Sequence, residues 1–216
     1  MNKLMKHTKI IGCIICMISA VPAFTAYGQQ SVNDKDGGIR QVAIKNNLLY
    51  DAAMIPNIGV EVALQDNWSL CGNWLYAWWQ NDSRHRFWHF YGGEIEVRKW
   101  LGKRARTHVL QGHHLGSYFM GGTYDFEWGH DGYMSDFSYN VGVSYGYAVK
   151  IARHLTLDFV IGIGYVGGYY RKYKPENGGY CILEYGDRSY FGPTKAEISL
   201  VWAIGDLFKG KKGGRK

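Results

Sequence analysis

The sequence predicts an all-β protein in which eight antiparallel strands form an up-and-down transmembrane β-barrel. Three observations favour this fold: side chains alternate in character along eight long segments, the connections alternate between short and long, and an export signal precedes them. Successive side chains of a strand point to opposite faces, so each segment presents one apolar face and one small or polar face.

The first element is a predicted signal peptide, residues 1–28. Three lysines precede an apolar run at 10–21, and Ala26 and Gly28 supply the small residues that a signal peptidase requires. The run is shorter than the roughly 20 apolar residues of a membrane-spanning helix. We therefore expect cleavage after Gly28 and a short periplasmic segment at 29–40.

Eight segments with period-two alternation follow the signal and make up the predicted barrel domain, 41–208. The segments lie at 41–53, 57–65, 68–79, 87–101, 108–126, 136–151, 154–173 and 190–205. Short connections are expected at 65–68, 102–107 and 151–155, and longer ones at 80–86, 127–135 and 174–189. The first hairpin, which turns near Pro56, is a short connection on the long-loop side. An even strand number with short turns at one end and longer loops at the other is typical of outer-membrane barrels.

The face opposite the apolar one carries charged residues in the middle of its strands. These residues are Lys45, Glu61, Glu94, Glu96, Arg98, Asp158, Lys195 and Glu197. An eight-stranded barrel has an interior only just wide enough for its side chains, whereas the apolar face holds bulky residues such as Tyr145, Phe159 and Trp202. We therefore expect the bulky face to meet lipid and the charges to form a mutually neutralising plug inside. A soluble lipocalin-like carrier, with the apolar face inside, is an alternative.

The formal net charge of +7 arises from the two ends of the chain. Three lysines lie in the signal and five basic residues lie in the C-terminal tail, 209–216, so the charges between them sum to −1. Without a clustered basic surface on the domain, no nucleic-acid partner is expected. We expect the tail to be a disordered solubilising end, or else a contact with anionic lipid or cell-wall polymer.

Two cysteines remain after the signal, and the topology predicts that they stay unpaired. Cys71 follows a short turn, whereas Cys181 lies in the last long connection, at the opposite end of the barrel. The hydrocarbon core that would separate them is about 30 Å thick, far beyond the reach of a disulfide.

Motif-like patterns predict neither a cofactor nor a metal. The glycine pattern at 162–168 matches a dinucleotide-binding motif, but a strand continues where that motif needs a helix. His85 and His89 are about 13 Å apart in a strand, and the adjacent His113 and His114 face opposite ways. No cofactor-binding or metal-binding residue is therefore assigned.

An enzymatic alternative comes from polar residues expected at the extracellular rim. Some eight-stranded outer-membrane barrels act on lipids with a serine, a histidine and an acid, which is an analogy at the level of the fold. This chain places at the rim Ser83, His85, His89, Asp125, His130, Asp131, Ser135 and Asp136. Polar loops contain such residues by default, so no catalytic residue is predicted, and a lipid-modifying enzyme is the alternative function.

Three stretches carry a family resemblance: IKNNLLYDAAMIPNIGVEVAL at 44–64, EVRKWL at 96–101 and YFGPTKAEISL at 190–200. They resemble an uncharacterised domain-of-unknown-function family of small Gram-negative outer-membrane β-barrel proteins. The resemblance implies an eight-stranded barrel and no established activity. Relatives tend to carry a cysteine pair in the last loop and to end soon after the final strand, whereas this chain has only Cys181 and continues into a basic tail.

We expect a protein of the Gram-negative outer membrane that is not an enzyme and has a structural or surface-interaction role through its extracellular loops. The expected partners are outer-membrane lipids, lipopolysaccharide and, at the loops, a surface fimbrial or glycan partner.

Overall fold

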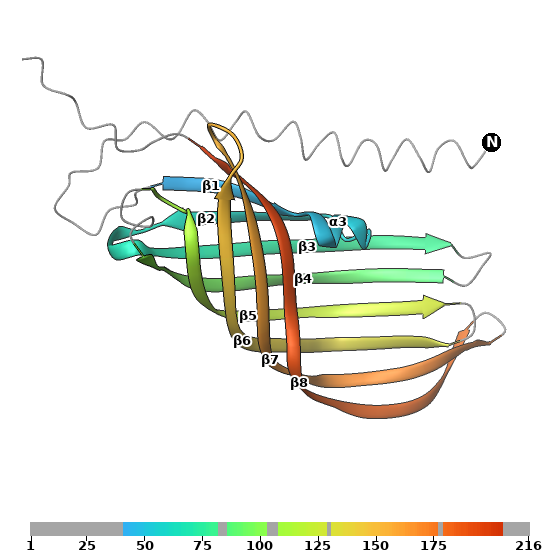
Figure 1. The fold of residues 1–216 in the computed structure, drawn as a ribbon. Helices are drawn as coiled ribbons and strands as arrows, with labels where there is room; N and C mark the ends of the chain where they lie inside the picture. Colours follow the sequence, from blue (N-terminus) through green and yellow to red (C-terminus); the bar gives the residue numbers. More distant parts are fainter. Residues whose placement is uncertain (1–40, 82–85, 103–107, 129–130, 177–178, 205–216) are drawn as a thin grey trace, which may run out of the picture. The chain divides into compact units, whose positions relative to one another are not determined.

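The computed structural model describes residues 41–81, 86–102, 108–128, 131–176 and 179–204. Its strands are β1 (Gln41–Asn47), β2 (Asn57–Ala63), β3 (Trp68–Asn81), β4 (Arg86–Trp100), β5 (Gly112–Trp128), β6 (Gly132–Lys150), β7 (Leu155–Glu176) and β8 (Gly179–Ala203). Each strand pairs antiparallel with the next along the chain, and β1 also pairs with β8, so the sheet closes into a barrel (Figure 1). The predicted all-β fold with eight antiparallel strands is confirmed.

Two of the connections at the end of the ring where β1 starts and β8 ends are short, as predicted. The connection at 65–68 is a 3₁₀ turn, Gln65–Asn67, and a turn at 151–154 joins β6 to β7. The predicted start of a strand at 108 was wrong, because β5 begins only at Gly112. Most of the predicted connection 102–107 lies outside the described residues, as do the predicted signal peptide and basic tail. Within the described ranges, no helix has the length and apolar character needed to cross a membrane.

A short helix, α3 (Leu48–Ala52), follows β1, so the predicted strand 41–53 was wrong beyond Asn47. Asn47 caps this helix, because its Oδ1 accepts a hydrogen bond from the Leu49 N–H at 3.0 Å. The helical residues are Leu, Tyr, Asp and Ala, without the β-branched side chains that favour a strand.

Asn57, the first residue of β2, ties the end of β1 to α3. Its Oδ1 accepts from the Asn47 N–H at 2.7 Å, and its Nδ2 donates to the Asn47 carbonyl at 2.9 Å and to Asp51 Oδ1 at 3.0 Å. We expect Asn57→Ala to lower the free energy of unfolding in detergent by about 1–3 kcal/mol, because it leaves backbone groups of Asn47 without partners. Asn46→Ala, which removes one bond to the Asn57 carbonyl, is the matched control; equal losses in urea titrations would contradict this account.

β5 and β7 end later than predicted and β6 and β8 begin earlier, so the predicted loops at 127–135 and 174–189 were wrong. Only a few residues separate β5 from β6 and β7 from β8, and the last hairpin occupies almost all of 174–189. A β-bulge moves the following side chains to the other face, so the period-two pattern breaks there. The register shifts at four places: Gly122/Tyr124, Met134/Ser138, Gly162/Ile163 and Lys172/Tyr173.

The ring closes at one end only, because β1 and β2 are short. β1 pairs with β8 along Ser199–Ala203, and β2 pairs with β3 as far as Leu75. Beyond α3, the strands β3 to β8 continue as an open sheet, which we call the arm (Figure 1). The arm begins after the row of paired residues Leu75, Gly92, Gly122, Ser138, Gly168 and Arg188.

Candidate functional site

The two faces of the ring divide as the alternation predicted. The interior positions are only 0–6% exposed; they are Lys45, Glu61, Glu94, Glu96, Arg98, Asp158, Lys195 and Glu197, which we call the ion cluster. On the outer face, Ile95 is 61% exposed, Val143 55% and Ile161 68%. Charge therefore lies inside the ring and apolar surface lies outside.

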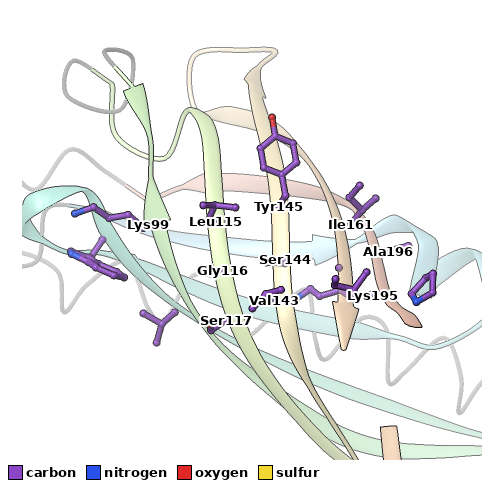
Figure 2. Close-up of a pocket in the computed structure, with 15 residues that line it drawn as sticks. Lys99, Leu115, Gly116, Ser117, Val143, Ser144, Tyr145, Ile161, Lys195 and Ala196 are labelled. Atoms are coloured by element: carbon purple, nitrogen blue, oxygen red, sulfur yellow. The ribbon is translucent and has the colours of Figure 1, made fainter. Parts of the chain in front are cut away.

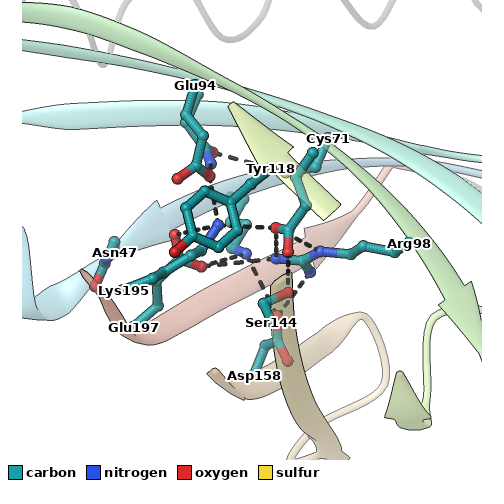
Figure 3. A network of polar contacts seen from close by, with 12 residues as sticks. Asn47, Cys71, Glu94, Arg98, Tyr118, Ser144, Asp158, Lys195 and Glu197 are labelled. Carbon is teal, nitrogen blue, oxygen red and sulfur yellow. Dashed lines mark hydrogen bonds and ion pairs between the residues drawn. The ribbon is translucent and has the colours of Figure 1, made fainter. Parts of the chain in front are cut away.

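Arg98 on β4 lies at the centre of the ion cluster. Its Nε and Nη2 donate to Glu96 Oε2 at 2.9 and 2.6 Å. Its Nη1 donates to Asp158 Oδ2 at 2.9 Å (Figure 3). The same Nη1 donates to Glu61 Oε2 at 3.2 Å. One guanidinium thus joins carboxylates from β2, β4 and β7, which its fixed fan of donors suits.

Two lysines complete the ion cluster from β1 and β8. Lys45 Nζ donates to Glu197 Oε2 at 2.8 Å. Lys195 Nζ donates to Glu94 Oε1 at 2.6 Å and to Glu96 Oε2 at 3.0 Å. The cluster therefore joins strands from different sides of the ring through its interior.

His114 on β5 contacts the ion cluster, a role that was not predicted from the sequence. Its Nε2 lies 2.9 Å from Asp158 Oδ1, and its ring packs against Trp100 with 4.6 Å between centroids. The prediction that His113 and His114 face opposite ways is confirmed, since His113 is exposed and lies 2.6 Å from the Tyr145 hydroxyl. The alternation along β5 was the available signal, because its inner face reads His114, Gly116, Tyr118.

The ion cluster fills the interior of the ring. A Cβ at Gly116 would collide with the Glu96 carboxylate, and one at Gly146 would collide with the His114 ring. The charged groups bind one another, and their burial keeps them from an external ligand. Chemically, the arrangement is a network of buried ion pairs and hydrogen bonds.

The glycine motif at 162–168 lies inside β7, as predicted. Gly164 faces Gly142 on β6, and a Cβ at Gly164 would lie 2.9 Å from the Gly142 Cα. These glycines therefore serve the close approach of two strands.

His89 and Asp125 are predicted rim residues that the structure brings near each other. His89 Nδ1 lies 3.9 Å from Asp125 Oδ2, and the His89 ring stacks on Trp78 at 4.0 Å. The Ser135 hydroxyl donates instead to the Tyr169 carbonyl at 2.6 Å. These residues therefore do not form a serine–histidine–acid arrangement.

The remaining acidic rim residues make ion pairs. Asp131 pairs with Lys172 at 3.1 Å, and Asp136 pairs with Arg171. In the ranges that the structure covers, no group of three or more His, Cys, Asp or Glu side chains could hold a metal ion. The other predicted rim residues lie outside these ranges: Ser83, His85 and His130.

Tyr173 organises a second polar cluster, on the arm, which the sequence did not predict. Its hydroxyl donates to Asp125 Oδ1 at 2.6 Å and to Glu127 Oε2 at 3.2 Å. Burial, reinforced by the two carboxylates, raises the pKa of Tyr173 well above its usual value. The phenol therefore stays protonated and holds β5 to β7.

A groove of about 970 Å³ lies on the outer surface of the ring (Figure 2). Leu115, Val143 and Ile161 line it from three neighbouring strands. Lys99 belongs to the same lining, but its Nζ lies over the Trp68 ring at 4.6 Å. A surface of this kind suits hydrocarbon chains.

Cys71 and Cys181 are both free thiols, and their exposures differ sharply. Cys71 is fully buried inside the ring, whereas Cys181 is exposed on the arm. We expect a water-soluble maleimide to label Cys181 in the folded protein and Cys71 only after unfolding, because a buried thiol is inaccessible. Peptide mass analysis would distinguish the sites, and rapid labelling of Cys71 in the folded protein would contradict its burial.

Comparison with protein families gives a match over residues 14–204, which includes every strand of the barrel. The matching family is described as a protein of unknown function, DUF3575. No curated protein and no solved structure matches the chain. Because the match covers most of the sequence, the chain belongs to the DUF3575 family.

Proposed function

We propose that this protein is a non-enzymatic outer-membrane β-barrel with a plugged polar interior and a structural or surface-interaction role. The observation that carries the proposal is the inverted distribution of side chains, with charges buried and the outer surface apolar. In water that surface would be unfavourable by about 25 cal/mol per Å². In a bilayer it is the surface that contacts lipid, and the closed sheet satisfies its backbone hydrogen bonds.

The dimensions of the apolar surface support the proposal. A strand crosses the hydrocarbon core with about 9–11 residues. β3 to β8 have 14 to 25 residues each, which is enough. β1 and β2 have only 7 residues each, and Leu48, Leu49 and Met54 in the connection between them are exposed apolar side chains. Aromatic residues suit a membrane boundary, and the exposed Trp68 and Trp202 lie at the end of the ring where β1 starts and β8 ends.

The two alternatives have less support. A soluble carrier needs an apolar cavity within the ring, whereas the ion cluster occupies that space and the apolar groove lies outside it. A lipid-modifying enzyme needs a nucleophile beside its base, whereas the Ser135 hydroxyl contacts a backbone carbonyl.

The proposal assigns two kinds of partner to two parts of the molecule. Outer-membrane lipids and lipopolysaccharide would contact the apolar band. The arm lies at the end of the ring opposite the start of β1 and the end of β8, so it would face outside the cell and meet a fimbrial or glycan partner.

Gel mobility tests this proposal. We expect the protein to sediment with outer membranes and to migrate differently before and after boiling, because small membrane barrels resist detergent until heated. A soluble periplasmic protein with the same mobility in both samples would support the carrier instead. A change in lipid A or phospholipid profile on deletion of the gene, restored by wild type but not by His89→Ala, would support the enzyme.

A further inference from the structure

Strand β8 has a long edge that no other strand covers in the described part of the chain. β7 pairs with β8 from Glu176/Gly179 to Leu155/Trp202, but β1 reaches only Ser199 on the other side. Helix α3 contacts β8 near the end of β1, and the sheet is open beyond it. One row of β8 backbone N–H and C=O groups therefore points away from the sheet.

The usable part of this row is Glu184–Gly192, which we call the open edge. Pro193 ends it on one side because proline has no N–H to donate. A register shift beside Leu183 ends it on the other side, where Tyr173 pairs with Ile182 and Lys172 pairs with Glu184. Between these limits the pairing of β8 with β7 is regular, so the outward groups keep the spacing of a sheet.

The two faces of the open edge carry different side chains. Glu184 and Arg188 share one face, because both contact Tyr170. The Tyr170 hydroxyl donates to Glu184 Oε1 at 3.5 Å, and the Arg188 guanidinium lies 5.8 Å from the centroid of the Tyr170 ring. Tyr185 and Phe191 alternate onto the other face and are each 72% exposed. Exposed aromatic residues on an edge strand favour pairing with another strand.

A cleft beside the open edge adds a pocket for a side chain. It measures about 580 Å³ and extends from Tyr185 and Asp187 of β8 over Tyr169 and Arg171 of β7 to Phe137 of β6. Strand addition takes affinity from main-chain hydrogen bonds and specificity from pockets for alternate side chains. The open edge offers both features.

We propose that the open edge binds an extended segment of a partner protein as an added antiparallel strand. The segment carries a basic residue opposite Glu184 and an acidic residue opposite Arg188 on one face. On the other face it carries apolar residues opposite Tyr185 and Phe191. This inference deepens the proposed surface-interaction role and rests on it only for the statement that the arm faces outside the cell.

A separate segment fits the open edge better than a second copy of β8 does. Two copies of β8 could pair antiparallel around a two-fold axis, with Glu184 of one copy opposite Arg188 of the other. The axis would then pass beside Gly186. The irregularity at Leu183 then falls opposite Ser189, so regular pairing is limited to Glu184–Arg188. A partner segment can follow the whole open edge.

The test uses the full chain in detergent and a synthetic peptide of about nine residues that has the proposed charges and apolar positions. We expect the peptide to slow amide hydrogen exchange in Glu184–Gly192 and to bind at least about tenfold more tightly than its charge-reversed version. The double variant Glu184→Lys with Arg188→Glu should reverse this preference. These side chains are exposed, so the variant should fold normally.

Two N-methylated peptides provide the backbone control. Methylation of alternate amides blocks only one edge of the peptide, so one version should lose binding and the other should keep it within about twofold. The proposal would be overturned if both methylated peptides bound equally well. It would also be overturned if the peptide and its charge-reversed version bound the wild type and the double variant with equal affinity. If hydrogen exchange in the open edge slowed with rising protein concentration in the absence of peptide, the open edge would instead bind a second copy of the chain. The peptide experiment needs no bilayer, so its failure is distinguishable from a failure of the gel-mobility and fractionation test.

Discussion

Replacement of Arg98 by methionine is expected to lower the free energy of unfolding by about 3–5 kcal/mol. The change removes the positive charge that contacts Glu61, Glu96 and Asp158. These buried carboxylates then have fewer ion pairs to offset the cost of their burial. Unfolding in urea, followed by tryptophan fluorescence in detergent, would measure the effect.

The neighbouring residue provides the control for Arg98. Lys99 points outward on the same strand, lies over Trp68 and donates to the Asp66 carbonyl at 2.6 Å. Lys99→Met should therefore cost less than about 1 kcal/mol. Adding Glu96→Gln to Arg98→Met should recover part of the loss, because it removes one of the excess negative charges. Equal costs for the two methionine variants, without recovery, would show that the ion cluster does not stabilise the ring.

Val143→Arg is expected to destabilise the protein in a bilayer by about 2–4 kcal/mol, since it places a charge on the lipid-facing surface. Val143 is 55% exposed, and Leu183 on the arm is 53% exposed. Leu183→Arg is therefore a control with the same accessibility but a position beyond the ring, and it should change stability by less than about 0.5 kcal/mol. Folding titrations in lipid vesicles would compare the two, and equal small effects would contradict a lipid-facing Val143.

The barrel could be predicted from the sequence where one face is buried and the alternation is regular. Val143 and Ile161 read as one face and Ser144 and Gly162 as the other, and the structure divides them in this way. The division depends on side-chain size, because a narrow interior accepts glycine and serine but not rows of tyrosine.

The arm could not be predicted in the same way because its strands contain bulges. Each shift, such as that between Met134 and Ser138, exchanges the two faces and hides the period-two signal. Helix α3 was missed because a single helical turn is too short for a 3.6-residue period to show. Its cap at Asn47 depends on one side-chain hydrogen bond.

The ion cluster was predictable as a set of inward charges but not as a network. Sequence parity places Arg98 and Asp158 inside, yet their contact joins β4 to β7 across the ring. The pairing of His114 with Asp158 depends on the same cross-ring geometry. At the rim, sequence could not show that the Ser135 hydroxyl would satisfy a backbone carbonyl rather than contact His89.

Collision of spin labels with dissolved oxygen and with a water-soluble nickel chelate tests most directly whether the outer surface lies in hydrocarbon. Each label would be attached to a single cysteine, introduced at Val143 or Ile163 on the outer face or at Asn140 on the inner face. The protein would contain no other cysteine and would be reconstituted into lipid vesicles. We predict strong relaxation by oxygen and weak relaxation by nickel at Val143 and Ile163, with low accessibility to oxygen at Asn140. Strong relaxation by nickel at Val143 and Ile163 would place that face in water and contradict the membrane assignment.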